Sequence, residues 1–210
     1  MVLKNYYYYF IKALPLPLCK KILKACRQKI TSPGTTGDKS PDDKKSHLYF
    51  SKDAPPVRYR DCKVAWIEEQ WIYDILNPFI QTANKEADWN FQWDWNETSQ
   101  FTVYKKGHYY GWHADQTANL YPKDRGTNIE GKIRKLSLTL QLTDKKNYTG
   151  GDFQFKWMHP AKGTEIQTVK DSKEIGTIIV FPSFVYHQVT PITKGKRESL
   201  VNWSLGKSFN

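Results

Sequence analysis

The chain has 210 residues, of which 39% are hydrophobic and 15% aromatic, and it carries a formal net charge of +11. This length suits one domain of ordinary size, and this share of apolar and aromatic residues excludes an intrinsically disordered chain. No run reaches the roughly 20 apolar residues of a transmembrane helix. Met1–Phe10 also lacks the pattern of a secretory signal peptide. We therefore expect a cytoplasmic protein with no membrane partner.

The first 63 residues hold most of the positive charge, with 14 Lys and Arg against 5 Asp and Glu, which places +9 of the net +11 there. Leu14–Ile30 has apolar residues at helical spacing between lysines and predicts an amphipathic helix. Thr31–Ser46 is rich in Thr, Ser, Pro, Gly, Asp and Lys and predicts a mobile loop. Residues 1–63 are thus expected to form an N-terminal helix and a basic mobile loop, in the same domain as a core over residues 64–210. Their charge fits a nucleic-acid or acidic-partner surface, but we favour ordinary solvated charge.

Three cysteines, Cys19, Cys26 and Cys62, form an odd set without C-x-x-C spacing. A secreted scaffold held by disulfides would need paired cysteines, so this pattern does not indicate one. Cys19 and Cys26 lie seven residues apart within the predicted helix. We interpret these two as buried thiols and not as metal ligands.

The core is predicted to begin with a helix from about Glu68 to Ala87 and to continue as strands. From Trp89 onward, short runs rich in aromatic and β-branched residues alternate with turn residues. No helix-length periodic segment separates these runs, which argues against a βαβ fold. The sequence predicts an all-β core with N-terminal helices, a jelly-roll or cupin-like double-stranded β-helix with supporting helices packed on one sheet. The predicted strands are Gln100–Tyr104, Leu136–Leu142, Gly151–Phe155, Ile166–Val169, Thr177–Phe181 and Glu198–Leu205.

His113 and Asp115 are the first candidate metal ligands in the sequence. Residues i and i+2 of a strand point to the same face, so these two side chains can offer an imidazole and a carboxylate to one ion. The pair alone is common, but His187 follows the strand near residue 181, and Arg197 follows ten residues later. Two histidines and one carboxylate on one face form the facial triad of non-heme iron(II) oxygenases.

The other histidines suit this role less well. His108 lies five residues before His113 and would face the opposite way on a continuous strand. His159 precedes a proline in a turn-like stretch, and His47 lies in the low-complexity segment. We interpret each of these three as a surface residue.

Several short motifs occur together in an order and at a spacing that match a known family. The set resembles the prolyl 4-hydroxylase-like branch of the Fe(II)/2-oxoglutarate-dependent dioxygenase superfamily, over roughly residues 64–206. The resemblance implies a double-stranded β-helix and a catalytic core over residues 64–210, with no catalytic residue beyond the metal ligands. The motifs are Tyr104-x-x-Gly107, His113-x-Asp115, Arg134-Lys-Leu-Ser137, Tyr148-x-Gly150-Gly151, Phe181-Pro-Ser183, His187 and Gly195-Lys-Arg197.

The resemblance also implies the cofactors. Fe(II) would be held by His113, Asp115 and His187, with 2-oxoglutarate chelating it, O₂ as the oxidant and ascorbate as the reductant. Arg197 would pair with the distal carboxylate of 2-oxoglutarate, a role that suits a planar and permanently charged guanidinium.

Further contacts with the cosubstrate are expected from three residues. Tyr104 matches the family tyrosine that hydrogen-bonds 2-oxoglutarate. Gln141 stands where some relatives carry a second tyrosine, and Gln141 or Thr139 can donate a hydrogen bond instead. Because the sequence departs from the family at this point, the partner of the distal carboxylate besides Arg197 stays open.

Three more residues match positions that line the peptide groove of prolyl hydroxylases: Tyr110, Arg134 and Trp203. Packing explains them equally well in a chain with so many aromatic residues. The expected function is hydroxylation of an unactivated C–H, foremost on a prolyl residue of a protein or peptide, with release of succinate and CO₂. A nucleic-acid oxidative demethylase and a free amino-acid hydroxylase remain as alternatives within the superfamily, and a non-catalytic cupin-like binding protein as an alternative outside enzymes.

Overall fold

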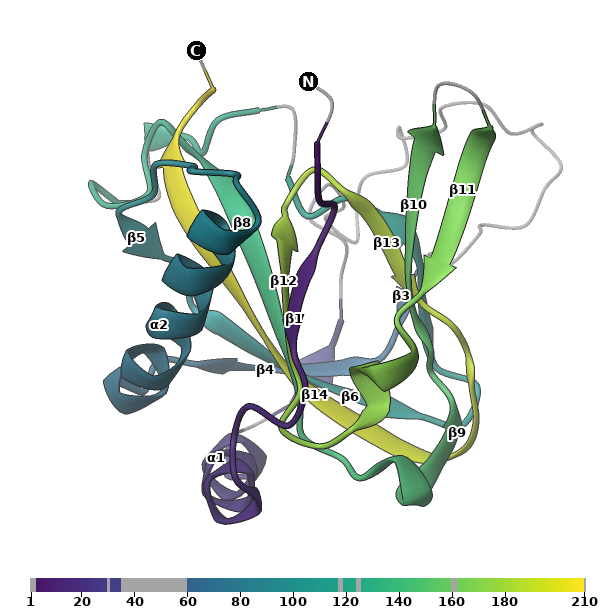
Figure 1. The fold of residues 1–210 in the computed structure, drawn as a ribbon. Coiled ribbons are helices and arrows are strands. Elements are labelled where there is room, and N and C mark those ends of the chain that lie inside the picture. Colours follow the sequence, from purple (N-terminus) through teal and green to yellow (C-terminus); the bar gives the residue numbers. More distant parts are fainter. Residues whose placement is uncertain are drawn as a thin grey trace, which may run out of the picture.

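The computed structural model describes residues 3–29, 31–34, 60–116, 119–123, 126–159 and 162–209. Two antiparallel sheets face each other, and two helices cover the outer face of the larger sheet (Figure 1). In chain order the helices and strands are β1 (Tyr8–Phe10), α1 (Leu16–Arg27), β2 (Ser32–Pro33), β3 (Arg60–Asp61), β4 (Lys63–Ile67), α2 (Gln70–Glu86), β5 (Trp95–Asn96), β6 (Ser99–Lys105), β7 (Tyr109–His113), β8 (Lys132–Gln141), β9 (Tyr148–Gly150), β10 (Phe153–His159), β11 (Gly163–Thr168), β12 (Ile178–Pro182), β13 (Tyr186–Val189) and β14 (Ile192–Lys207).

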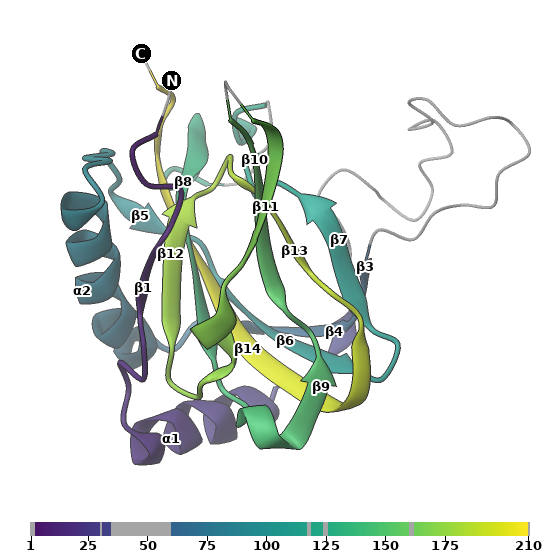
Figure 2. The ribbon, with the colours of Figure 1, turned by 45° about the vertical axis from the view of Figure 1, so that its right-hand side comes forward.

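The chain contributes strands to both sheets in turn, singly or in short runs. The larger sheet has the order β1-β12-β8-β14-β6-β4-β2, with β5 and β9 also paired to β14, and the smaller sheet has the order β11-β10-β13-β7-β3. From β6 to β14 the chain crosses repeatedly from one sheet to the other, as Figure 2 shows. This crossing of antiparallel strands is the double-stranded β-helix that the sequence predicted, and the prediction of the fold class is confirmed.

Two hydrophobic cores follow from the alternation of side chains along the strands. Leu136, Leu138 and Leu140 of β8 are fully buried on the side of the larger sheet that the helices cover. Ser137 and Thr139 of the same strand lie between the sheets, where they border the second core. That second core, between the two sheets, includes Tyr104, Tyr148, Phe153, Phe155, Ile179, Phe181 and Val189.

The helices pack on the larger sheet as predicted. Helix α1 buries Cys19, Ile22 and Cys26 along one face and is shorter than the predicted range, because a proline starts its first turn. Both cysteines are buried free thiols, as the sequence indicated. Helix α2 lies close to its predicted bounds. None of the described helices has the length and apolar composition needed to cross a membrane.

All six predicted strands are present with shifted ends, but the predicted loop over residues 31–46 is wrong at its start. Ser32 and Pro33 form the edge strand β2, where Ser32 pairs with Val64 of β4. Pairing with another strand overrides the loop-like composition, and an edge strand tolerates proline. Residues 35–46 of that loop lie outside the described part of the chain.

The N-terminal segment contributes to both sheets. Strand β1 pairs with β12 of the larger sheet, and β3 pairs with β7 of the smaller one. Neither strand was predicted, because each is very short and exists only through its partner strand. The division of the chain at residues 63 and 64 stays a prediction.

Candidate active site

Three potential metal ligands meet between the two sheets. His113 ends β7 and is the direct cross-strand partner of His187 on β13. Asp115 follows two residues after His113, and its Oδ1 and Oδ2 lie 3.7 Å from Nε2 of His113 and 3.6 Å from Nε2 of His187. The candidate ligand atoms of the three residues all lie within 4.8 Å of one another. The structure therefore brings together the three residues that the sequence singled out.

Asp115 does not lie on the same strand as His113, contrary to the predicted geometry. Strand β7 stops at His113, and Asp115 sits in the bend that follows. The backbone N–H groups of Asp115 and Gln116 both donate to the carbonyl of Ser183, at 2.9 Å each. These two hydrogen bonds turn the chain toward His187, so the bend positions the carboxylate in place of strand alternation.

The backbone fixes which nitrogen of each imidazole is free. Nδ1 of His113 lies 2.7 Å from the carbonyl of Gly111, and Nδ1 of His187 lies 3.0 Å from the carbonyl of Val185. A carbonyl only accepts, so in the neutral imidazoles Nδ1 carries the proton and Nε2 keeps its lone pair toward Asp115. This arrangement is the one that metal-binding histidines adopt.

The surroundings of the Asp115 carboxylate also fit the binding of a cation. Its Oδ2 is buried and has no hydrogen-bond partner among the described residues. A buried acceptor without a partner is rare in a folded protein, and a bound ion would satisfy it. Two imidazole nitrogens and one carboxylate are ligands that suit Fe(II).

The protonation states at neutral pH suit metal binding as well. Burial and, second to it, the neighbouring His187 lower the pKa of His113 to about 3. Burial tends to raise the pKa of Asp115, but His187, His113 and Arg134 outweigh it and lower that pKa to about 2. Asp115 is thus ionised and His113 neutral at pH 7, as metal ligands must be.

A cavity of about 40 Å³ lies beside these three residues, and Arg197 lines it. Arg197 is 3% exposed, lies opposite Tyr104 in the pairing of β14 with β6, and donates from Nη1 to Oγ of Ser199 at 3.1 Å. Tyr104 and Thr139 also line the cavity. The structure thus places three of the four predicted cosubstrate residues at one cavity.

The fourth predicted cosubstrate residue, Gln141, is placed differently. It is not among the described residues that line the cavity, and its amide nitrogen donates to the carbonyl of Thr143 at 2.7 Å and to the hydroxyl of Tyr148 at 3.1 Å. Its two N–H groups are therefore used within the protein. Tyr148, whose role the sequence did not suggest, is buried and accepts a hydrogen bond from Gln141. The nearby charge of Arg197 opposes the rise in the pKa of Tyr148 that burial causes.

Two of the three residues expected to contact substrate line the cavity, and the third does not. The ring of Tyr110 stacks on His113 with a centroid separation of 3.4 Å, and both Tyr110 and Trp203 line the cavity. Arg134 is not among the described lining residues. Its guanidinium lies 3.8 Å from the ring centroid of Trp203 and donates from both Nε and Nη2 to Glu97. Arg134 therefore packs against the ring of Trp203 without lining the cavity itself.

Arg60 is a cavity residue that the sequence analysis missed. It lies on β3, pairs with Tyr110 of β7 and lines the same cavity as Arg197. In the sequence, Arg60 is one of the 14 Lys and Arg residues of the basic N-terminal segment. A signal was present nonetheless, because Arg60, Cys62 and Val64 alternate, and Cys62 and Val64 are buried in the core between the sheets.

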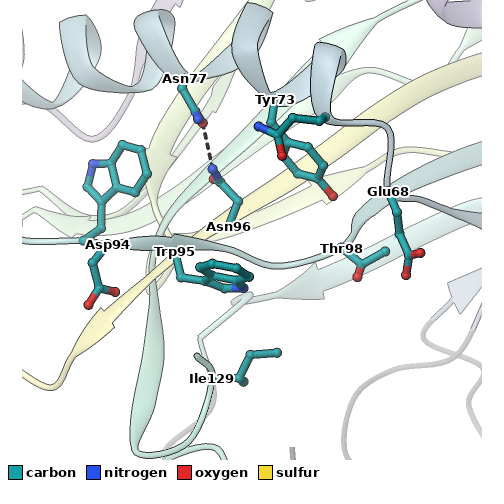
Figure 3. A pocket seen from close by; sticks show the side chains of 10 residues that line it. Glu68, Tyr73, Asn77, Asp94, Trp95, Asn96, Thr98 and Ile129 are labelled. Atoms are coloured by element: carbon teal, nitrogen blue, oxygen red, sulfur yellow. Dashed lines mark hydrogen bonds between the residues drawn. The ribbon is translucent and has the colours of Figure 1, made fainter. Parts of the chain in front are cut away.

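A larger hollow of about 490 Å³ lies elsewhere, between helix α2 and strand β5 (Figure 3). Trp95 and Asn96 of β5 line it, and Asn96 donates to Asn77 of α2 at 2.8 Å. Among the described residues that line this hollow there is no histidine, and His113, Asp115 and His187 are the one described set that could hold a metal. The smaller cavity is the candidate active site because of its ligand set.

Comparison with known proteins agrees with this geometry. A family model described as the 2OG-Fe(II) oxygenase superfamily matches residues 99–205, just over half of the chain. A PKHD-type hydroxylase of Teredinibacter turnerae is 27% identical over 104 residues, 50% of this chain and 41% of that protein. One from Alteromonas mediterranea is 33% identical over 104 residues, 49% and 41% of the two chains. The chain thus spans about two fifths of the length of these curated relatives.

Solved structures show the same fold at low identity. A prolyl-4-hydroxylase of Pseudomonas putida superposes with a TM-score of 0.62 at 19% identity, covering 98% of this chain and 95% of that one. A prolyl hydroxylase of Trichoplax adhaerens, in complex with a peptide fragment of a hypoxia inducible factor, gives 0.64 at 15% identity, covering 96% and 84%. With the family model, the fold and the ligand set in agreement, the chain belongs to the 2OG-Fe(II) oxygenase superfamily.

Proposed function

We propose that this protein is an Fe(II)- and 2-oxoglutarate-dependent dioxygenase that hydroxylates a prolyl residue of a protein or peptide and releases succinate and CO₂. The observation that carries the proposal is the meeting of His113, Asp115 and His187 in one cavity with the buried Arg197. The names of the relatives, PKHD-type hydroxylase and prolyl hydroxylase, support the reaction and the substrate class.

His113 and His187 would hold Fe(II) through Nε2, and Asp115 through its carboxylate. Bound iron and 2-oxoglutarate supply the oxidation, in which O₂ gives one oxygen atom to succinate and the other to the substrate carbon. Ascorbate would serve as the reductant that keeps the iron in the ferrous state. The protein needs no nucleophile or general base of its own, so its residues act by binding and positioning.

Arg197 would pair with the distal carboxylate of 2-oxoglutarate, because its guanidinium is buried and lies beside three hydroxyl-bearing residues that line the same cavity or contact it. Ser199 accepts a hydrogen bond from it, the Tyr104 ring centroid lies 5.5 Å from it, and its charge opposes the rise in the pKa of the nearby Tyr148 that burial causes. These groups would orient the guanidinium fork before the cosubstrate arrives. A bidentate ion pair in a cavity with little water is strong and directional.

Aromatic side chains restrict water around the metal ligands. The ring of His187 lies 4.6 Å from the ring centroid of Phe181, 5.6 Å from that of Phe153 and 6.3 Å from that of Phe155. A dry site strengthens the electrostatic contacts of bound groups and suppresses side reactions of the oxidant. Control of a reactive oxidant is needed by a dioxygenase and not by a protein that only binds a ligand.

A protein or peptide substrate is favoured over nucleic acid. Tyr110 and Trp203 line the candidate site next to the metal ligands, and the Trichoplax neighbour is described in complex with a peptide. Sequence-independent binding of nucleic acid would need Lys and Arg clustered near the cavity. Only two of the described residues that line the cavity are basic, Arg60 and Arg197.

The test is incubation of purified protein with Fe(II), 2-oxoglutarate, ascorbate and proline-containing peptides, followed by succinate measurement and mass spectrometry. Wild type should release succinate and add one oxygen atom to proline. His187→Ala should lose both iron and succinate release, whereas His108→Ala should keep both, because His108 does not line the cavity. Full succinate release by His187→Ala would contradict the proposal.

A further inference from the structure

We propose that Tyr121 is a positioning residue of the metal site: acting through Glu97 and Arg134, it holds the bend that presents Asp115 to the metal. The inference rests on the proposed function, because it concerns how a ligand of that function's metal is held. It depends on a continuous series of hydrogen bonds, from the Tyr121 hydroxyl to Glu97, from Arg134 to Glu97, and from Arg134 to the backbone of Asp115.

Asp115 depends on this bend because it lies outside the strand. Strand pairing places His113 opposite His187, but β7 ends before Asp115. The N–H group of Asp115 donates to the carbonyl of Ser183 at 2.9 Å, and its carbonyl accepts from Nη1 of Arg134 at 3.3 Å. The peptide groups on both sides of Asp115 are thus held by hydrogen bonds. A residue that fixes the Arg134 side chain therefore also helps to fix the direction of the Asp115 carboxylate.

Glu97 fixes the plane of the Arg134 guanidinium. Nε and Nη2 of Arg134 donate to the two carboxylate oxygens of Glu97, at 2.6 Å and 2.8 Å. Both side chains are largely buried, with exposed fractions of 19% for Arg134 and 16% for Glu97. A forked ion pair of this kind has a defined geometry and restricts rotation of the guanidinium. The third nitrogen, Nη1, is thereby directed at the carbonyl of Asp115.

The backbone of Glu97 is itself attached to the larger sheet. Its N–H group donates to the carbonyl of Trp203 at 2.9 Å, and its carbonyl accepts from the side-chain amide of Asn202 at 3.2 Å. Both partners lie on β14. The freedom that remains to Glu97 is therefore rotation of its side chain, and a further donor to the carboxylate would limit this rotation.

Tyr121 supplies that donor. Its hydroxyl donates to Oε2 of Glu97 at 2.8 Å, and the same oxygen accepts from Nε of Arg134. Burial is the main cause that raises the pKa of Tyr121 to about 12, so the hydroxyl keeps its proton at neutral pH. The backbone of Tyr121 is held as well, because it donates to the carbonyl of Lys132 at 3.0 Å and accepts from the N–H group of Gly131 at 2.9 Å. The hydroxyl is thus presented to Glu97 from a backbone that is bonded to the start of β8.

Loss of the Tyr121 hydroxyl would loosen this arrangement without removing any metal ligand. The Glu97 carboxylate could then rotate more freely, and the Arg134 guanidinium would rotate with it. The hydrogen bond from Nη1 to the Asp115 carbonyl would weaken, and the Asp115 carboxylate would be less well oriented for a metal ion. A purely structural hydroxyl would instead lower the stability of the fold and leave the metal affinity unchanged.

The test compares Tyr121→Phe, which removes only the hydroxyl, with Tyr7→Phe. Tyr7 is a matched control because its hydroxyl also takes part in one side-chain hydrogen bond, accepting from Gln167 of β11 at 2.7 Å. Mn(II) binding is measured by calorimetry without 2-oxoglutarate and O₂. Thermal unfolding of the metal-free proteins measures their stability. Neither readout depends on turnover.

The expected loss of metal affinity depends on how directly each residue contacts Asp115. Loss of a group that orients a metal ligand directly weakens metal binding by about 10- to 100-fold, and we expect this of Arg134→Lys. Tyr121 acts through two other residues, so Tyr121→Phe should bind Mn(II) about 3- to 10-fold more weakly than wild type. Tyr7→Phe should bind Mn(II) as wild type does. In the double variant, Tyr121→Phe should add little to Arg134→Lys, because the same contact with Asp115 is already lost.

Three results would overturn the inference. They are wild-type affinity for Mn(II) in Tyr121→Phe, an equal loss of affinity in Tyr7→Phe, and additive effects of Tyr121→Phe and Arg134→Lys on the free energy of binding. If Arg134→Lys does not fold, Glu97→Gln takes its place in the double variant with the same expectation. The proposed function fails on a different measurement, when wild type binds metal but no proline peptide gives succinate or hydroxyproline. The two failures are therefore distinguishable.

Discussion

Replacement of Arg197 by alanine separates a 2-oxoglutarate enzyme from any other protein with the same metal ligands. Arg197 is 3% exposed, and its guanidinium would be the positive partner of the distal carboxylate. Without it, the carboxylate would lose the buried positive group that lies next to Tyr104 and Ser199. We expect Arg197→Ala to lose 2-oxoglutarate binding and to keep the metal, because His113, Asp115 and His187 are unchanged.

The size of the effect follows from burial. Removing one partner of a buried ion pair costs about 3 to 5 kcal/mol, which is about two to nearly four powers of ten in the dissociation constant. At a 2-oxoglutarate concentration 100 times the wild-type dissociation constant, binding stabilises the wild-type fold by about 2.7 kcal/mol. A variant that binds 100 times more weakly would gain only about 0.4 kcal/mol at the same concentration.

The assay is thermal unfolding with Mn(II) present, with and without 2-oxoglutarate. For a chain of this length, wild type should gain about 5 to 11 °C in Tm and Arg197→Ala about 1 to 2 °C. Arg197→Lys should fall between them, because a point charge cannot reproduce two parallel hydrogen bonds. Lys194→Ala, at an exposed cation on the same strand, should behave like wild type. A full gain in Arg197→Ala, or loss of its metal, would refute the assignment of Arg197 to the cosubstrate.

Two further predictions concern the stability of the fold. Burial tends to raise the pKa of Glu198, but hydrogen bonds from Arg27 and a neighbouring lysine outweigh it and lower this pKa. The ion pair of Glu198 therefore stabilises the fold above pH 4.5, and this stabilisation is lost as the pH falls through the lowered pKa. In urea unfolding at pH 7, the free energy of unfolding of Glu198→Gln should thus be about 1 to 3 kcal/mol lower than that of wild type. This difference should disappear at acid pH. Gly195→Ala should lower the free energy of unfolding by more than Gly107→Ala does in the same assay. Both glycines have positive φ, but a Cβ at residue 195 would lie 2.0 Å from the carbonyl oxygen of Asn147, whereas a Cβ at residue 107 would meet no atom within 4 Å.

The sequence predicted the central strands well because each has at least one face against a core. In β8 the apolar residues that face the helices alternate with polar ones, and this period is visible without knowledge of the partner strands. Strand β12 is instead an unbroken apolar run, because both of its faces pack against a core. Strands β1 and β3 have three and two residues, too few to show a period. Their conformation is decided by β12 and β7, which lie more than 45 residues away in the chain.

Contacts between strands that are distant in the chain also limited the prediction of the candidate site. Residues within one motif could be assigned from the sequence, since His113 and Asp115 are neighbours and His187 lies a fixed distance before Arg197. The position of Tyr148 could not, because it follows from the pairing of β9 with β14, in which Gly195 lies opposite Tyr148. Gln141, at the position where some relatives carry a second tyrosine, donates to the Tyr148 hydroxyl.

Arg60 carries this reasoning one step further. It lies before residues 99–205, which the family model matches, and it enters the cavity only because β3 pairs with β7 beside Tyr110. The metal ligands and Arg197 lie within the matched residues, and their chemistry is common to any substrate. The place of Arg60 in the cavity therefore comes from strand pairing and not from a motif, and only the folded structure brings it next to Tyr110.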